Sequence, residues 1–171
     1  MADKAMNVYL NDHLAGATLG SNLAEQIQAQ NEGTALGELM GSLAPEIEAD
    51  RQTLIEVMER LDTSRNPVKR ATAWIAEKAS QVKLSGQTSG EPELGTFVAL
   101  ETLCLGVQGK LCLWTALKKV ADRYEPLRSM NLDALIERAQ TQHSALEGER
   151  MAASRRALGP VEGQQSGQAS S

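Results

Sequence analysis

The chain has 171 residues and a formal net charge of −5, and 42% of its residues are hydrophobic although only 3% are aromatic. This composition excludes a wholly disordered chain and supplies enough Leu, Ala, Val, Ile and Met for the core of one domain. The acidic balance argues against a protein that binds nucleic acid over a broad surface. With few aromatic side chains and only 5 Pro, the chain favours packed helices over β-sandwiches.

The first two predicted helices cover residues 7–31 and 34–61. Gly33 ends the first helix, and Thr34 is a suitable N-cap for the second. Apolar residues recur at heptad spacing along the second helix, and Asp50 occupies one of its core positions. Pro45 lies within this pattern, so we expect it to kink the helix or to break it briefly.

Three more helices are predicted in the second half of the chain. The third follows Asn66 and Pro67 and reaches about residue 84, the fourth covers 92–122, and the fifth covers 131–158. Residues 159–171 have no apolar periodicity and are expected to form a disordered tail. Residues 1–158 are therefore predicted to form a single helical domain.

The apolar run 94–117 is interrupted by Glu101, Gln108 and Lys110, so it predicts a buried helix of a bundle and not a membrane span. The amino terminus lacks a basic segment followed by an apolar core, so no signal peptide is predicted. The two cysteines, Cys104 and Cys112, lie on one predicted helix too far apart to form a disulfide and are interpreted as small buried hydrophobic residues. These features predict a cytoplasmic protein.

The lengths of the connections predict the topology. Short connections make antiparallel hairpins of the first two helices and of the last two, and the long segment 62–91 links the hairpins. This segment, with its own helix, is long enough to return along the bundle. We therefore predict an all-α, ferritin-like four-helix bundle with an additional helix in the long crossover between helices two and three of the bundle. A plain up-and-down bundle with an extra helix packed outside is the alternative.

Polar residues from all four long helices fall at one level when the rise of about 1.5 Å per residue is counted from the helix ends. These residues are His13, Asp50, Gln108, Gln142 and His143. An unpaired buried polar group costs about 1–3 kcal/mol, so a shared layer indicates that the groups interact. One interpretation is a hydrogen-bonded network that fixes the register of the helices.

The other interpretation of the layer is a metal or redox site in the bundle core. Two histidines and a carboxylate can hold iron or zinc. The candidate ligands are His13, Asp50 and His143, with Glu101 or Glu147.

Separately, Gly16 and Gly20 share a helix face and are predicted to let another helix approach closely.

Basic residues gather at one predicted end of the bundle, and they are Arg65, Lys69, Arg70, Lys118, Lys119 and Arg123. They could form a basic patch for an anionic partner. The alternative is that cations near helix C-termini complement the helix dipole while the others face solvent.

Three stretches, VYLNDHLAGATLG, LAPEIEADRQTLIEVMERL and ALETLCLGVQGKLCLWTAL, resemble a group of small bacterial proteins with a ferritin-like fold and no assigned activity. The larger relatives of that group, ferritins and rubrerythrins, carry a di-iron centre held by Glu residues and Glu-x-x-His motifs. This chain contains no Glu-x-x-His, and its nearest segment, 140–143, has glutamine in place of the carboxylate.

The expected function is that of a small, non-enzymatic helical-bundle protein without a cofactor, in a structural or interaction role that family analogy links to stress. One alternative is a metal-binding protein or metal-dependent oxidoreductase that uses iron or zinc. Another is an adaptor that binds an anionic partner through the basic end. Self-association stays open, no nucleic-acid or membrane partner is expected, and the sequence identifies no protein partner.

Overall fold

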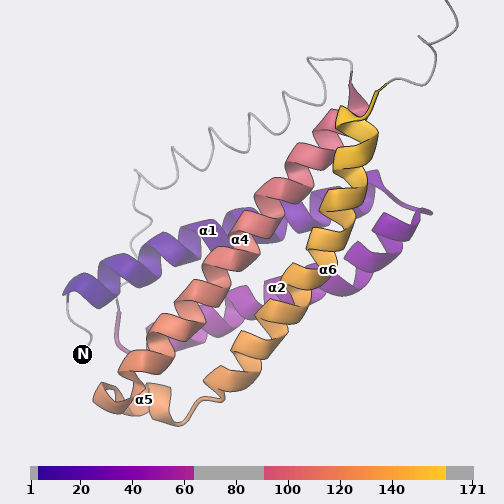
Figure 1. Ribbon diagram of the computed structural model, residues 1–171. Helices are drawn as coiled ribbons and strands as arrows, with labels where there is room; N and C mark the ends of the chain where they lie inside the picture. Colours follow the sequence, from indigo (N-terminus) through magenta and orange to yellow (C-terminus); the bar gives the residue numbers. More distant parts are fainter. Residues whose placement is uncertain (1–3, 64–90, 161–171) are drawn as a thin grey trace, which may run out of the picture.

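The computed structural model describes residues 4–63 and 91–160, and this part of the chain forms helices and no strands (Figure 1). The predicted all-α class is confirmed. The long helices are α1 (Lys4–Gln30), α2 (Ala35–Arg60), α4 (Pro92–Val120) and α6 (Leu132–Leu158). The 3₁₀ turn η1 (Ala121–Arg123) and the short helix α5 (Glu125–Arg128) connect α4 to α6. The helix predicted at 66–84 and the tail from residue 161 onward lie outside the described residues.

The turn between α1 and α2 is determined by local chemistry. Gly33 adopts the left-handed φ of 77° that favours glycine. Thr34 caps α2, since its Oγ1 accepts a hydrogen bond from the backbone N–H of Gly37 at 3.1 Å. A Cβ on Gly37 would lie 2.0 Å from the carbonyl oxygen of Asn31, so this close approach requires glycine.

Helix α2 is continuous through Pro45, so the brief break expected there is not observed. Pro45 is exposed. The proline has no N–H to donate to the carbonyl oxygen of Gly41, four residues earlier.

Two apolar clusters fill the interior and show how the helices run. One cluster joins the end of α1 and the start of α2 to the start of α4 and the end of α6; its largest members include Ile27, Met40, Leu100 and Leu146. The other joins the opposite ends of the four helices; its largest members include Leu10, Met58, Trp114 and Leu132. Helices α1 and α6 therefore run in one direction, and α2 and α4 run in the other (Figure 1).

Helix α4 is the most apolar of the described helices and packs against both α1 and α6. With η1 it forms the stretch Pro92–Arg123, the one candidate among the described residues that is long and apolar enough to cross a membrane by length and composition. A core helix of a bundle has the same composition, and Leu100, Leu103, Trp114 and Leu117 are buried inside the protein.

Candidate functional site

A polar layer separates the two apolar clusters on three of the helices. Asp50 of α2, Lys110 of α4 and Gln142 of α6 each lie between apolar residues of the two clusters. Asp50 is 2% exposed and Gln142 is 1% exposed. Because α2 and α4 run parallel and α6 runs antiparallel to them, the three side chains meet at the middle of the bundle.

The layer is held by ion pairs and hydrogen bonds that join three helices. The ammonium of Lys110 donates to Asp50 Oδ2 at 2.6 Å and also to Gln142 Oε1. The guanidinium of Arg138 pairs with Asp50 Oδ1. Gln142 Nε2 donates to Glu46 Oε2 at 3.0 Å. We call these five residues the charged cluster.

Burial affects the electrostatics of the charged cluster. Loss of solvent lowers the pKa of the Lys110 ammonium below its usual range, and the neighbouring Asp50 carboxylate acts in the opposite direction. Removal of one partner of a buried ion pair leaves an uncompensated charge and typically costs about 3–5 kcal/mol. The cluster is therefore a strong constraint on the relative positions of α2, α4 and α6.

A cavity of about 380 Å³ lies beside the charged cluster, between α1, α2 and α4. Asp50 and Lys110 belong to its wall, so the cluster faces α6 on one side and the cavity on the other. The rest of the wall combines apolar side chains with a few polar ones. The wall residues include Tyr9, Asp12, His13, Ile47, Arg51, Leu54, Leu103, Val107, Leu113 and Trp114.

Four glycines complete the wall of the cavity: Gly16 and Gly20 on α1, and Gly106 and Gly109 on α4. A Cβ added at any of them would meet no atom within 4 Å. The prediction that Gly16 and Gly20 allow another helix to approach closely is therefore wrong: these positions border open space. Glycine at these four positions leaves that space free of side chains.

Neither His13 nor Trp114, both in the cavity wall, has a hydrogen-bond partner among the described residues. His13 is half-buried, and its ring packs edge-on against Tyr9 with centroids 4.5 Å apart. Burial lowers the pKa of His13, and the nearby Asp12 carboxylate opposes this effect. Trp114 is fully buried, and its indole Nε1–H has no acceptor, at a typical cost of about 1–3 kcal/mol.

The structure brings together only part of the predicted polar layer. Asp50 and Gln142 belong to the charged cluster, and His13 lies across the cavity from them on α1. Gln108 is exposed and lies outside the layer, and its Nε2 is 3.9 Å from the sulfur of Cys112. His143 is half-buried on α6 and is not part of the cavity wall.

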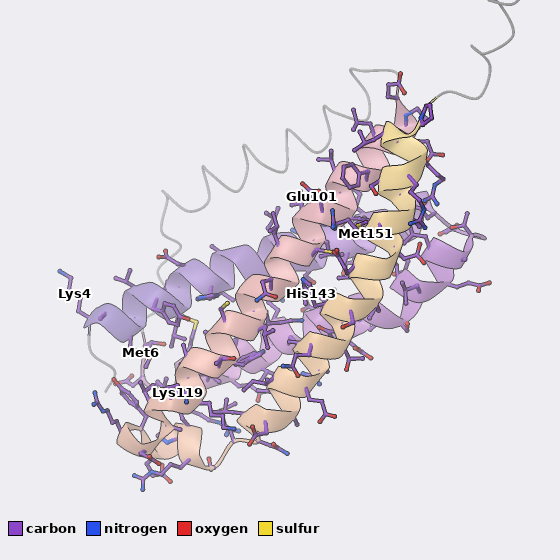
Figure 2. The ribbon with its side chains drawn as sticks, viewed as in Figure 1. Lys4, Met6, Glu101, Lys119, His143 and Met151 are labelled. Atoms are coloured by element: carbon purple, nitrogen blue, oxygen red, sulfur yellow. The ribbon has the colours of Figure 1, made fainter. Side chains whose placement is uncertain are left out.

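The remaining candidate ligands lie apart from Asp50. Arg150 pairs with Glu147 at 2.7 Å and with Glu101 at 3.3 Å. The hydrogen bonds from Arg150 lower the pKa of Glu147, and His143 adds a smaller effect in the same direction. Figure 2 shows Glu101 nearer to the start of α4 than His143, at a different height along the α4–α6 hairpin.

These residues do not fit a di-iron or mononuclear metal centre. Among the described residues, no group of three or more His, Cys, Asp or Glu side chains is arranged to hold a metal ion. The oxygens of Asp50 are occupied by a lysine and an arginine, which would repel a cation. Glu101 and Glu147 both pair with Arg150.

The two cysteines differ. Cys104 is buried, as predicted, and burial raises the pKa of its thiol to about 11, so it is a poor nucleophile. Cys112 is exposed, so the expectation that both thiols are buried is wrong for this residue. Cys112 occupies the outward face of α4, one turn beyond the equally exposed Gln108.

The basic patch is only partly described. Lys118, Lys119 and Arg123 are exposed near the end of α4, and Lys118 pairs with Asp133 of α6. Figure 2 shows Lys119 at the end of the hairpin that carries α5. The other members of the predicted patch, Arg65, Lys69 and Arg70, lie outside the described residues.

The sequence interpretation missed both cations of the charged cluster. A signal for Lys110 was present, since Leu103, Val107, Lys110 and Trp114 follow the heptad spacing of a buried face. Gln108, which was chosen instead, does not fit that spacing. Arg138 lies four residues before Gln142 and so on its helix face, but nothing local shows that it reaches Asp50 on α2.

The site thus combines an ionic layer with an adjoining cavity whose wall carries hydrogen-bond donors without acceptors. Within the layer, Arg138 Nε is buried and has no hydrogen-bond partner among the described residues. The cavity wall can receive a small molecule, whereas the ionic layer can hold the helices in register. No known protein family, curated protein or solved structure matches this chain.

Proposed function

We propose that this chain is a non-enzymatic helical-bundle protein that binds a small, mainly apolar molecule in the cavity between α1, α2 and α4. The observation that carries this proposal is the cavity itself, whose volume of about 380 Å³ lies within the usual range of small-molecule sites. Its wall is mostly apolar and includes a few polar groups, which is the usual composition of such a site.

The glycines support a binding role over a purely structural one. A glycine inside a helix costs about 1 kcal/mol relative to alanine, and four such positions line this one cavity. A bundle selected only for stability would gain from side chains there, because a Cβ at each position meets open space. A cavity that receives a ligand requires that the space stay free.

The proposal includes a ferritin-like bundle in which side-chain charges replace the di-iron centre. The helix directions support this topology, since α2 and α4 run parallel, as in bundles with one long crossover connection. The charged cluster supports the second part, because Lys110 and Arg138 bring positive charge to the buried carboxylate of Asp50. In this view the cluster holds the helices in register and forms one wall of the binding cavity.

The proposal is tested by titration with Nile red, a neutral apolar dye that fluoresces more strongly when it is removed from water. We expect saturable binding with one dye molecule per chain. The variant Gly106→Leu should abolish it, because Gly106 lies one turn before Lys110 and a leucine there would fill the space beside the ammonium.

The matched control is Gly148→Leu on α6. Gly148 is also a helix-interior glycine with no atom within 4 Å of an added Cβ, but it does not line the cavity. This variant should bind the dye as the original protein does. Equal loss in both variants, or no saturable binding at all, would contradict a binding role for the cavity.

A further inference from the structure

We infer that the ligand is a small amphipathic monocarboxylate, with its carboxylate beside Lys110 and Trp114 and its apolar chain along the leucine-rich wall of the cavity. This inference rests on the proposed binding function and specifies the ligand class. It follows from the hydrogen-bonding groups that the wall leaves without partners.

The ammonium of Lys110 has one donor to spare. A lysine ammonium carries three N–H donors. Asp50 and Gln142 accept two of them, and the third has no acceptor in the part of the chain that the structure describes. Because Lys110 lines the cavity, a ligand oxygen is the natural acceptor for this donor.

Trp114 carries a second unused donor, which is buried at the wall of the same cavity. It lies four residues after Lys110 on α4, so the two side chains share a helix face, and both belong to the cavity wall. Its buried indole Nε1–H lacks an acceptor among the described residues. Lysine and tryptophan donate hydrogen bonds and accept none, so a ligand group that meets both must accept two hydrogen bonds, as a carboxylate can.

Lys110 is the cation of the charged cluster that lines the cavity. The cluster as a whole is balanced, because the carboxylates of Asp50 and Glu46 match the charges of Lys110 and Arg138. A ligand anion in the cavity would therefore interact with the ammonium of Lys110 through its unused donor. Arg51, also in the wall, is already paired with Glu48 at 2.7 Å.

Two other groups that border the cavity are compatible with a carboxylate. Asp12 is exposed, so water screens its charge. His13 can donate a hydrogen bond from one ring nitrogen while neutral. The apolar part of the ligand would contact Leu54, Leu103 and Val107.

The test compares decanoate with decanol by isothermal titration calorimetry, since the two have chains of the same length and differ in the head group. We expect decanoate to bind with one molecule per chain and decanol to bind about tenfold more weakly or worse, which is the usual effect of a hydrogen bond to a charged group. Equal affinities would overturn the carboxylate assignment and leave the cavity as an apolar site. Binding of neither compound, with no binding of Nile red, would overturn the proposed function itself.

Two variants locate the carboxylate. Lys110→Met should weaken decanoate binding about tenfold and weaken decanol binding much less, because decanol carries no charge. Trp114→Phe keeps the ring and removes the Nε1–H, so it should weaken decanoate severalfold and decanol little. If Lys110→Met fails to fold, Trp114→Phe and the comparison of decanoate with decanol test the position of the carboxylate. Unchanged decanoate affinity in Trp114→Phe would remove Trp114 from the site, and Gly148→Leu should bind both compounds as the original chain does.

Discussion

The side of α4 that faces α6 and the side that faces α1 differ in how their polar groups are paired and in how closely they pack. Toward α6, the buried polar atoms of Lys110, Gln142 and Asp50 are paired with one another, and α4 and α6 pack closely. Toward α1, glycines face open space, and the indole N–H of Trp114 has no partner in the described part of the chain.

The difference indicates which polar groups are structural. A polar group that is buried and fully paired within the protein stabilises one arrangement of helices and leaves nothing for a ligand. A polar group beside an open cavity that has an unused hydrogen-bond donor can form that hydrogen bond with a bound molecule. Lys110 belongs to both sides, since it pairs with Asp50 and also lines the cavity.

The largest effect is expected on the paired side. Asp50→Ala should lower the free energy of unfolding by about 3–5 kcal/mol, because Lys110 would remain buried without its carboxylate. Urea denaturation monitored by circular dichroism measures this change. Glu56→Ala, an exposed carboxylate on the same helix, should change stability by less than about 0.5 kcal/mol.

A double variant sharpens this prediction. In Asp50→Ala with Lys110→Met, the unpaired buried cation is gone, so the total loss should be smaller than the sum of the two single losses. If the two losses were strictly additive, Asp50 and Lys110 would not interact, and the ion pair assigned to the α6-facing side of α4 would be contradicted.

For the side of α4 that faces the cavity, we predict a smaller change in the free energy of unfolding, of opposite sign. Gly106→Ala should raise the free energy of unfolding by about 0.5–1 kcal/mol, because alanine is the better helix former and its methyl group meets open space. Gly37→Ala should lower stability, since its Cβ would collide with the carbonyl oxygen of Asn31. Thermal melts measure both changes. A destabilised Gly106→Ala would show that the space beside Gly106 is filled, and Gly37→Ala serves as the comparison at a position where a Cβ does not fit.

The smallest effect is a pH dependence from the open side. Burial lowers the pKa of His13 in the folded protein, so the unfolded chain binds a proton at higher pH than the folded one. The stability from neutral His13 is present above the unfolded pKa of about 6.5 and is lost as the pH falls below it. The titratable groups that line the cavity together with His13 are Tyr9, Asp12, Asp50, Arg51 and Lys110.

The measurement is urea denaturation between about pH 7.5 and 5.5. His13→Gln should lose less stability than the original chain over this interval, because it has no imidazole to protonate. His143→Gln serves as the control for loss of a histidine outside the cavity wall. Parallel pH profiles for the original chain and His13→Gln would mean that His13 is solvated, and the cavity would not extend to α1.

Local sequence patterns predicted the four long helices of the described residues. Thr34 caps α2, Asn131 caps α6 through a hydrogen bond to the N–H of Ala134, and Gly33 ends the first hairpin's turn. Asp50 was correctly placed in the core, because it interrupts a heptad pattern whose other members are apolar. Each of these features depends on residues a few positions apart, so periodicity and capping rules are sufficient.

The sequence by itself determined the helices, their caps and the burial of Asp50, since backbone hydrogen bonding and helical periodicity are short-range properties. Only the tertiary structure decided that Lys110 and Arg138, 60 and 88 residues away, are the partners of Asp50. It also decided that Gly16 and Gly20 border a cavity and not a helix contact. The physical reason is that the rotation and crossing of whole helices select these neighbours, and a shift of one residue in register would replace Lys110 by another side chain.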